Sequence, residues 1–266
     1  MGAIDMAGLV GERDIVLVTL DALRYDVAVG ALAEGVTPHL AGLLPGGVWE
    51  RRHSPGSFTY AAHHAFLAGF LPTPAAPGRH ERLLAARFMG SETTGGKTAV
   101  FDAPDIVSGL RAEGYYTICI GGVGFFNPAT PLGRVLPGLF DEAHWSEEMG
   151  VTSRRSTAVQ VGVARERLGW VGAGRRAFML LNVSATHQPN CIFVEGAEVD
   201  DVRTQMAALA YVDEQLAGLW AVLRERGAVV IICADHGTAY GEDGYWGHRL
   251  AHEVVWTVPF GVFLLG

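Results

Sequence analysis

Cysteine is scarce in this chain, with only Cys119, Cys191 and Cys233 among 266 residues. Three cysteines are too few, and odd in number, to form a disulfide framework, so the fold depends on a hydrophobic core. Cys119 and Cys233 lie in apolar runs of the kind that form strands. Thiols in such runs are expected to be buried and unreactive.

Long apolar segments are absent as well. No stretch approaches the roughly 18 consecutive apolar residues that a membrane-spanning helix needs. The amino-terminal residues 1–10 contain no basic region followed by an apolar stretch, as a secretory leader would. These absences predict a soluble, cytoplasmic protein that has no membrane partner and acts on a soluble substrate.

Positive charge is in deficit, because 20 Lys and Arg residues face 28 Asp and Glu residues and the net charge is −8. A broad nucleic-acid interface needs clustered Lys and Arg, so nucleic acid is excluded as a partner. A small phosphorylated substrate is not excluded, because a bound metal ion can supply the positive charge locally. The composition leaves the oligomeric state open.

Apolar residues make up 49% of the chain and charged residues 18%, which provides ample material for a core. Apolar strand-like runs alternate with helical patterns, an order typical of an α/β/α sandwich with a mostly parallel central sheet. A single domain over 1–266 is the simplest account, because no long linker interrupts the chain. We predict strands over 14–20, 48–53, 115–120, 177–184, 227–232 and 255–265, and helices over 37–44, 59–67, 105–113 and 202–226.

Two of the predicted strands are followed by residues of the types that commonly bind metal ions. Asp21 follows the strand over 14–20, and Asp235 and His236 follow the apolar run over 227–232. Ligands of open α/β sheets lie outside the carboxyl ends of the strands, so these side chains are expected to meet. Each Asp alone is better explained by a helix cap. The adjacent Asp and His favour a divalent cation, with Zn or Mn the expected metal.

Thr59 begins a predicted helix, where unpaired backbone N–H groups and the helix dipole favour an anion. A hydroxyl group at this position that also contacts a metal ion can lose its proton and attack phosphorus or sulfur. The alternative is that Thr59 only caps the helix, a role that Ser57 could also fill.

Four segments in order along the chain resemble motifs of the alkaline phosphatase superfamily. They are residues 20–26 (LDALRYD), 59–69 (TYAAHHAFLAG), 182–189 (NVSATHQP) and 234–242 (ADHGTAYGE). The likeness covers nearly the whole chain and is strongest to the sulfatase-like branch, which includes phosphoethanolamine and lipoteichoic-acid transferases. Short, uncharacterised bacterial sulfatase-like proteins are similar too. The resemblance implies an alkaline-phosphatase-like α/β/α fold.

The resemblance also implies roles for individual residues. Thr59 matches the nucleophile, and His187 and His248 match histidines that face the substrate. The residues that the resemblance implies as ligands of one metal ion are Asp21, Thr59, Asp235 and His236. A second metal ion would need His187, His248 and His252. Expected substrate contacts are His63, which stands where sulfatases carry an Arg, Asn127 after a predicted strand, and Arg24 in the first motif.

Two departures from the sulfatase pattern narrow the chemistry. Position 59 is not Cys, so the formylglycine of ordinary sulfatases cannot form there. Residues 121–124 (GGVG) replace the Lys and His that sulfatases place after a strand. These departures favour a metal-dependent hydrolase or phosphoryl transferase that acts on a phosphate ester over one that acts on a sulfate ester.

Two other functions compete with this hypothesis. Residues 91–98 (SETTGGKT) resemble the phosphate-binding P-loop around Lys97, although Ser91 replaces the first Gly and the segment falls in a Gly- and Pro-rich loop over 72–98. An enzyme that binds a nucleotide at Lys97 is therefore one alternative. The other is a non-catalytic module that binds a metal ion or a partner.

Overall fold

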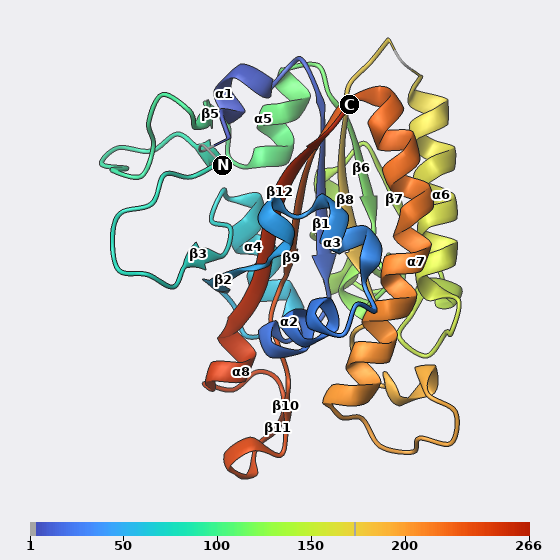
Figure 1. Cartoon of the computed structure of the whole chain (residues 1–266). Coiled ribbons are helices and arrows are strands. Elements are labelled where there is room, and N and C mark those ends of the chain that lie inside the picture. Colours follow the sequence, from blue (N-terminus) through green and yellow to red (C-terminus); the bar gives the residue numbers. More distant parts are fainter. Residues whose placement is uncertain (1–3, 173) are drawn as a thin grey trace.

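The computed structural model describes residues 4–172 and 174–266. The expectation that residues 1–10 contain no leader falls partly outside the described residues, because these begin at residue 4. An eight-stranded sheet forms the centre of the described chain, in the order β3-β2-β12-β9-β1-β8-β6-β7 (Figure 1). Strands β9, β1, β8, β6 and β7 run parallel, whereas β12 is antiparallel to both β9 and β2. Its strands are β1 (Asp14–Leu20), β2 (Glu50–His53), β3 (Thr73–Pro74), β6 (Tyr116–Ile120), β7 (Glu142–His144), β8 (Ala177–Val183), β9 (Ala228–Ala234) and β12 (Thr257–Leu265).

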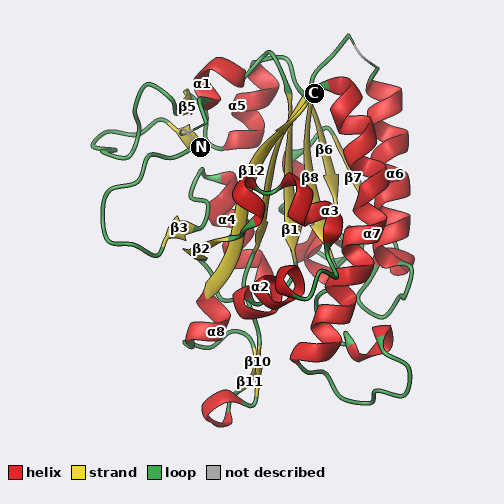
Figure 2. Ribbon diagram, viewed as in Figure 1, coloured by secondary structure: helices red, strands yellow, loops and turns green. Residues whose placement is uncertain are grey.

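Helices cover both faces of the sheet, which gives three layers (Figure 2). The helices are α1 (Met6–Leu9), α2 (Tyr25–Ala33), α3 (Pro38–Leu43), α4 (Thr59–Leu67), α5 (Ile106–Ala112), α6 (Ser156–Val171), α7 (Val202–Arg226) and α8 (Glu253–Trp256). Buried residues of α2, α3, α6 and α7 share one core cluster, and those of α1, α4 and α5 share the other. The prediction of an α/β/α sandwich with a mostly parallel sheet is confirmed.

Strand β1 lies between the two cores and contributes to both. Val16, Val18 and Leu20 belong to the core under α7, and Ile15 and Leu17 belong to the opposite one. Successive side chains of a strand point to opposite faces, so a continuous apolar run is what a strand covered on both faces requires. The same reasoning accounts for the buried run of β9.

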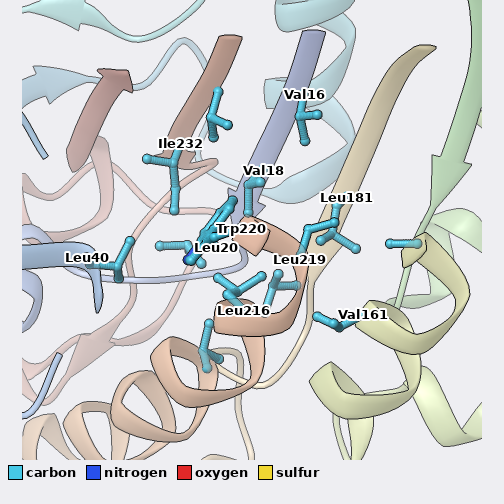
Figure 3. Packing of buried hydrophobic residues seen from close by; sticks show 14 of the residues in the cluster. Val16, Val18, Leu20, Leu40, Val161, Leu181, Leu216, Leu219, Trp220 and Ile232 are labelled. Carbon is cyan, nitrogen blue, oxygen red and sulfur yellow. The ribbon is translucent and has the colours of Figure 1, made fainter. Parts of the chain in front are cut away.

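Helix α7 is the longest helix of the described chain and packs along the sheet. Asp201 caps it through a capping box with Thr204, so its first N–H groups are satisfied. Leu216, Leu219 and Trp220 recur at helical spacing and point toward Val18 and Leu20 of β1 (Figure 3). Burial of side chains of this size stabilises a fold by about 1.5–3 kcal/mol each.

Helix α6 was not predicted, and its buried face explains why. Three of its six buried residues are polar, namely Ser156, Thr157 and Gln160. The apolar period that reveals an amphipathic helix is therefore weak along this segment. Helix α2 was not predicted either. All the helices and strands that were predicted are present, with ends shifted by at most two residues.

The P-loop interpretation of residues 91–98 is wrong for this fold. The segment connects β4 (Leu84–Ala86) to β5 (Ala99–Phe101), so a strand follows Lys97 where a P-loop requires a helix. A carboxylate oxygen of Glu81 accepts hydrogen bonds from the backbone N–H of Lys97 and the hydroxyl of Thr98. An acidic group thus lies where a P-loop would hold a phosphate. Among the described residues, no helix is long and apolar enough to cross a membrane.

Candidate functional site

The candidate site lies at the carboxyl ends of three neighbouring parallel strands. In the register of the sheet, Leu20 of β1 lies beside Ala234 of β9 and beside Val183 of β8. The residues that follow these three positions therefore meet at one edge of the sheet. They include Asp21 and Asp235, as the sequence predicted.

Asp21, Asp235 and His236 form a compact cluster that has the composition of a metal site. One ligand atom from each residue lies within 4.8 Å of the others, and all three side chains are fully buried. His236 Nε2 lies 3.7 Å from Asp21 Oδ1 and 3.6 Å from Asp235 Oδ2. Two carboxylates and an imidazole suit a divalent cation such as zinc or manganese.

The hydrogen bonds of the cluster leave the atoms that would face a cation without partners. Asp235 Oδ1 accepts the backbone N–H groups of Ala22 and His236, whereas Asp235 Oδ2 and Asp21 Oδ1 have no hydrogen-bond partner. His236 Nδ1 lies 2.8 Å from the carbonyl oxygen of Gly237, which assigns the proton to Nδ1 and a lone pair to Nε2. Buried carboxylate oxygens are costly without a partner, so the residues present fit a cation.

Without a cation, the cluster holds its carboxylates in an unfavourable environment. Burial, followed by the charge of Asp235, raises the pKa of Asp21 from 3.8 to about 6. Burial raises the pKa of Asp235 from 3.8 to about 7. Burial also lowers the pKa of His236. These shifts all favour neutral side chains, which is expected where a positive charge belongs.

A pH dependence of the metal-free protein follows from these shifts. An unfolded chain releases the carboxyl protons near pH 3.8, whereas the folded protein releases them near pH 6 and 7. The folded protein binds more protons in this window, so its stability falls as the pH rises from about 4 to about 7. Buried histidines with lowered pKa values, such as His63 and His248, act in the opposite direction.

The variant Asp235→Asn removes the titrating carboxyl group and leaves the histidines in place. Its difference from the wild type therefore reports the contribution of the carboxyl group alone. We expect the melting temperature of the metal-free variant to exceed that of the metal-free wild type by a margin that grows between pH 4 and pH 8. Thermal unfolding in the presence of a chelator measures this difference. A margin that stays constant or shrinks with rising pH would show that the buried carboxylate is already compensated.

Thr59 is the first residue of α4, and its hydroxyl group points at the cluster. Thr59 Oγ1 lies 3.4 Å from Asp21 Oδ2 and 3.4 Å from His236 Nε2. Phe58 is the N-cap of α4, and no side chain caps the helix. The capping role that competed for Thr59 and Ser57 is therefore absent, and the hydroxyl is available to the cluster.

His187 and His248 lie on the open side of the cluster. The ring of His248 lies 4.6 Å from that of His236 and 5.3 Å from that of His187, measured between centroids. Burial, followed by the charges of His236 and His187, lowers the pKa of His248 to about 3. Both residues and Thr59 line a cleft of about 970 Å³. The lining also includes the apolar side chains of Val123, Phe125, Leu132, Trp145 and Val151.

The structure does not place His63 at the substrate. His63 is fully buried beneath Thr59, and its Nδ1 lies 2.8 Å from the carbonyl oxygen of Thr59. Its Nε2 lies 2.9 Å from Thr19 Oγ1. The prediction of a substrate contact is corrected for this reason: one helical turn after Thr59, the side chain points into the core and supports the first turn of α4.

Arg24 and Asn127 are not among the residues that line the cleft either. The buried guanidinium of Arg24 forms ion pairs with Asp26 and Glu242, which satisfy its charge. Asn127 Oδ1 accepts the N–H of Ala129 and shapes a turn. Both predicted substrate contacts are corrected, because carboxylates engage Arg24 and a turn engages Asn127.

The three histidines named for a possible second metal ion do not come together in the structure. Among them, Asp21, Asp235 and His236 are the one group of acidic, His or Cys side chains with the required spacing. His252 Nδ1 caps α8 and its Nε2 lies 3.1 Å from Asp243 Oδ2, so His252 does not join His187 and His248.

Three residues of the site, Thr19, Asn182 and Arg249, were not predicted from the sequence. Asn182 of β8 donates to Asp21 Oδ2 and to Thr19 Oγ1, so a buried polar layer lies under the cluster. Polar residues inside otherwise apolar strands were the available signal for both. Arg249, which lines the cleft, follows the predicted His248, and nothing in the sequence distinguished it from an ordinary surface cation.

No family model and no curated protein sequence matches this chain. The C-terminal periplasmic domain of phosphoethanolamine transferase EptC from Campylobacter jejuni matches with a TM-score of 0.62 and 14% identity, over 95% of this chain and 79% of that one. The lipoteichoic acid synthase LtaP from Listeria monocytogenes matches with a TM-score of 0.64 and 14% identity, over 97% and 67%.

A protein of the alkaline phosphatase superfamily from Vibrio parahaemolyticus matches with a TM-score of 0.59 and 18% identity, over 95% of this chain and 60% of that one. The chain therefore has the alkaline phosphatase fold in its sulfatase-like form. The resemblance that the four sequence motifs indicated is confirmed at the level of the fold.

These comparisons overturn the expectation of a cytoplasmic protein. The matching EptC domain from Campylobacter jejuni is periplasmic, as is the matching domain of EptC from Escherichia coli. The expectation rested on the absence of a leader in residues 1–10 and of a membrane-spanning run. Neither absence determines the compartment.

Proposed function

We propose that the protein is a metal-dependent enzyme that hydrolyses a phosphate ester or transfers its phosphoryl group, with Thr59 as the nucleophile. The observation that carries this proposal is the position of Thr59 Oγ1, 3.4 Å from both Asp21 Oδ2 and His236 Nε2 and at the wall of the cleft. A cleft of about 970 Å³ suits a small phosphorylated molecule.

Asp21, Asp235 and His236 would hold one zinc or manganese ion, with Thr59 Oγ1 completing the donor set. When bound, the ion supplies Lewis-acid charge that lowers the pKa of a neighbouring hydroxyl group and stabilises negative charge on phosphoryl oxygens. The protein holds the donors rigidly, since Asp235 Oδ1 accepts two backbone N–H groups and Asn182 donates to Asp21.

In the proposed reaction the Thr59 hydroxyl loses its proton to solvent in the cleft, and its oxygen forms a bond to phosphorus. The bond between phosphorus and the leaving-group oxygen breaks in line, and the electron pair stays on that oxygen. A water molecule or an acceptor alcohol then attacks phosphorus, releases phosphate or a new ester, and returns the proton to Thr59. Water as the acceptor gives hydrolysis, and an alcohol gives transfer.

His187 and His248 act on the substrate side in this proposal. His248 is neutral at pH 7, because burial lowers its pKa to about 3, so it serves as a hydrogen-bond partner of a phosphoryl oxygen. His187 then donates the proton that the leaving-group oxygen takes up. The buried His63 supports the carbonyl oxygen of Thr59 and takes no part in proton transfer.

The experiment that tests the function is a turnover screen of the metal-loaded protein. The substrates are 4-nitrophenyl phosphate, bis(4-nitrophenyl) phosphate and 4-nitrophenyl sulfate, each with zinc and with manganese. We expect turnover of at least one phosphate ester, little turnover of the sulfate ester, and a phosphate on Thr59 detected by mass spectrometry after acid quenching. Uniform inactivity with metal bound would favour a non-catalytic metal-binding module.

A further inference from the structure

The cleft contains one arginine and no lysine among the described residues that line it. The cation is Arg249, and the acidic residue Glu147 is on the lining as well. Residues 121–124 (GGVG), next to the cluster in the fold, contribute no positive charge. Recognition of a phosphoryl group by a charged side chain therefore falls to Arg249.

The backbone holds Arg249 in an unusual conformation. Its φ angle is +70°, in the left-handed region that side chains other than Gly rarely adopt. The N–H of Arg249 donates to the carbonyl oxygen of Ser57 at 2.8 Å, which ties this loop to the residues just before Thr59. Strained residues of this kind cluster at functional sites. The loop follows β10 (Ala239–Tyr240) and β11 (Trp246–Gly247), which project from the carboxyl edge of the sheet (Figure 1).

The guanidinium of Arg249 has no acidic partner. It lies over the ring of Phe58, 5.5 Å from its centroid, and forms no ion pair with a described residue. Arg24, Arg167 and Arg226, by contrast, each pair with a carboxylate. An unpaired guanidinium keeps all its donors for a ligand.

The charge of Arg249 reaches the cluster. Burial is the largest cause of the lowered pKa values of His236 and His248, and the charge of Arg249 lowers both further. Arg249 lines the same cleft as Thr59 and His248, where the phosphoryl group would lie.

We propose that Arg249 is a substrate-binding and catalytic residue that holds the non-bridging oxygens of the transferred phosphoryl group. The inference rests on the proposed function and adds a residue to it. The planar guanidinium matches two phosphoryl oxygens at once, which a lysine ammonium cannot do. Its charge compensates the negative charge that the reaction brings to a cluster with two carboxylates.

The test measures binding of inorganic phosphate to the metal-loaded full chain by calorimetry, together with kcat and KM for 4-nitrophenyl phosphate. Arg249→Met keeps the apolar stem and removes the charge, and we expect phosphate to bind at least about 10-fold more weakly, as loss of a charge-assisted pair implies. Arg249→Lys should recover part of the affinity. The same substitutions should lower kcat as well as raise KM.

Two controls separate recognition from structure. Arg175→Met removes an exposed guanidinium that lies over Tyr116, 4.9 Å from the ring centroid and away from the cleft, and should leave phosphate binding unchanged. Arg249→Gly relieves the left-handed strain, so it should lose phosphate affinity like Arg249→Met while its melting temperature stays equal or rises. A drop in melting temperature with unchanged phosphate affinity would assign Arg249 to the loop alone.

The outcomes also separate this inference from the proposed function. If Arg249→Met binds phosphate within twofold of the wild type, the assignment of Arg249 is wrong and the function of Thr59 stands. If the wild-type protein with metal binds no phosphate and turns over no phosphate ester, the proposed function fails and Arg249 has no substrate to hold.

Discussion

Replacing Thr59 by alanine is expected to lower turnover of the metal-loaded protein by at least about 10³-fold, as removal of a catalytic nucleophile does in other enzymes. In the proposed reaction the oxygen of this hydroxyl group attacks phosphorus, and no other described hydroxyl contacts both Asp21 and His236. Thr59 does not cap α4, so the helix should not lose stability through a missing cap. The measurement is kcat for the phosphate ester identified in the screen, with circular dichroism and metal content to establish that the variant is folded and loaded.

Two matched variants test whether the hydroxyl group of Thr59 itself is required. Thr59→Ser keeps the hydroxyl and should retain activity within about 10-fold, because only a methyl group is lost. Ser57→Ala removes a neighbouring hydroxyl and should leave turnover unchanged. Activity of Thr59→Ala close to that of the wild type would mean that water attacks the substrate directly and that no phospho-threonine forms.

Replacing Asp235 by asparagine is expected to weaken binding of zinc or manganese by at least about 100-fold and to abolish the stabilisation that metal provides. Asparagine has the same shape, and its oxygen can still accept the N–H groups of Ala22 and His236. The unpartnered Oδ2, which would face the cation, becomes an amide nitrogen that cannot bind one. Mutation of residues that only hydrogen-bond to metal ligands typically lowers metal affinity by about 10–100-fold. Loss of a direct ligand should therefore lower it by no less.

Metal titration followed by calorimetry, together with the melting temperature with and without metal, measures this effect. Asp213→Asn is the control, because Asp213 is a buried carboxylate that accepts the N–H groups of His39 and Leu40 at the start of α3, away from the cluster. It should lower stability and leave metal affinity unchanged. Equal metal affinity of wild type and Asp235→Asn would remove Asp235 from the metal site.

The cluster of Asp21, Asp235 and His236 was predictable because its members follow strands that the sequence makes easy to recognise. The apolar runs that became β1 and β9 are continuous, and Asp21 and Asp235 mark their ends. Thr59 was predictable because its helix begins at that residue and has a regular pattern. The roles of Arg24, Asn127 and His63 were not predictable. Arg24 and His63 meet side chains far away in the sequence, Glu242 and Thr19, and Asn127 meets the backbone of its own turn.

By itself the sequence determined the class of fold and the residues of the cluster, because burial on both faces of a parallel sheet requires long apolar runs, and ligands bind where such strands end. Only the tertiary structure decided the register that brings Asp21 beside Asp235, the partner that engages each remaining polar side chain, and the position of Arg249 in the cleft. These features depend on contacts between residues far apart in the chain. A local pattern carries information about which face of an element is buried, and none about which distant group it meets.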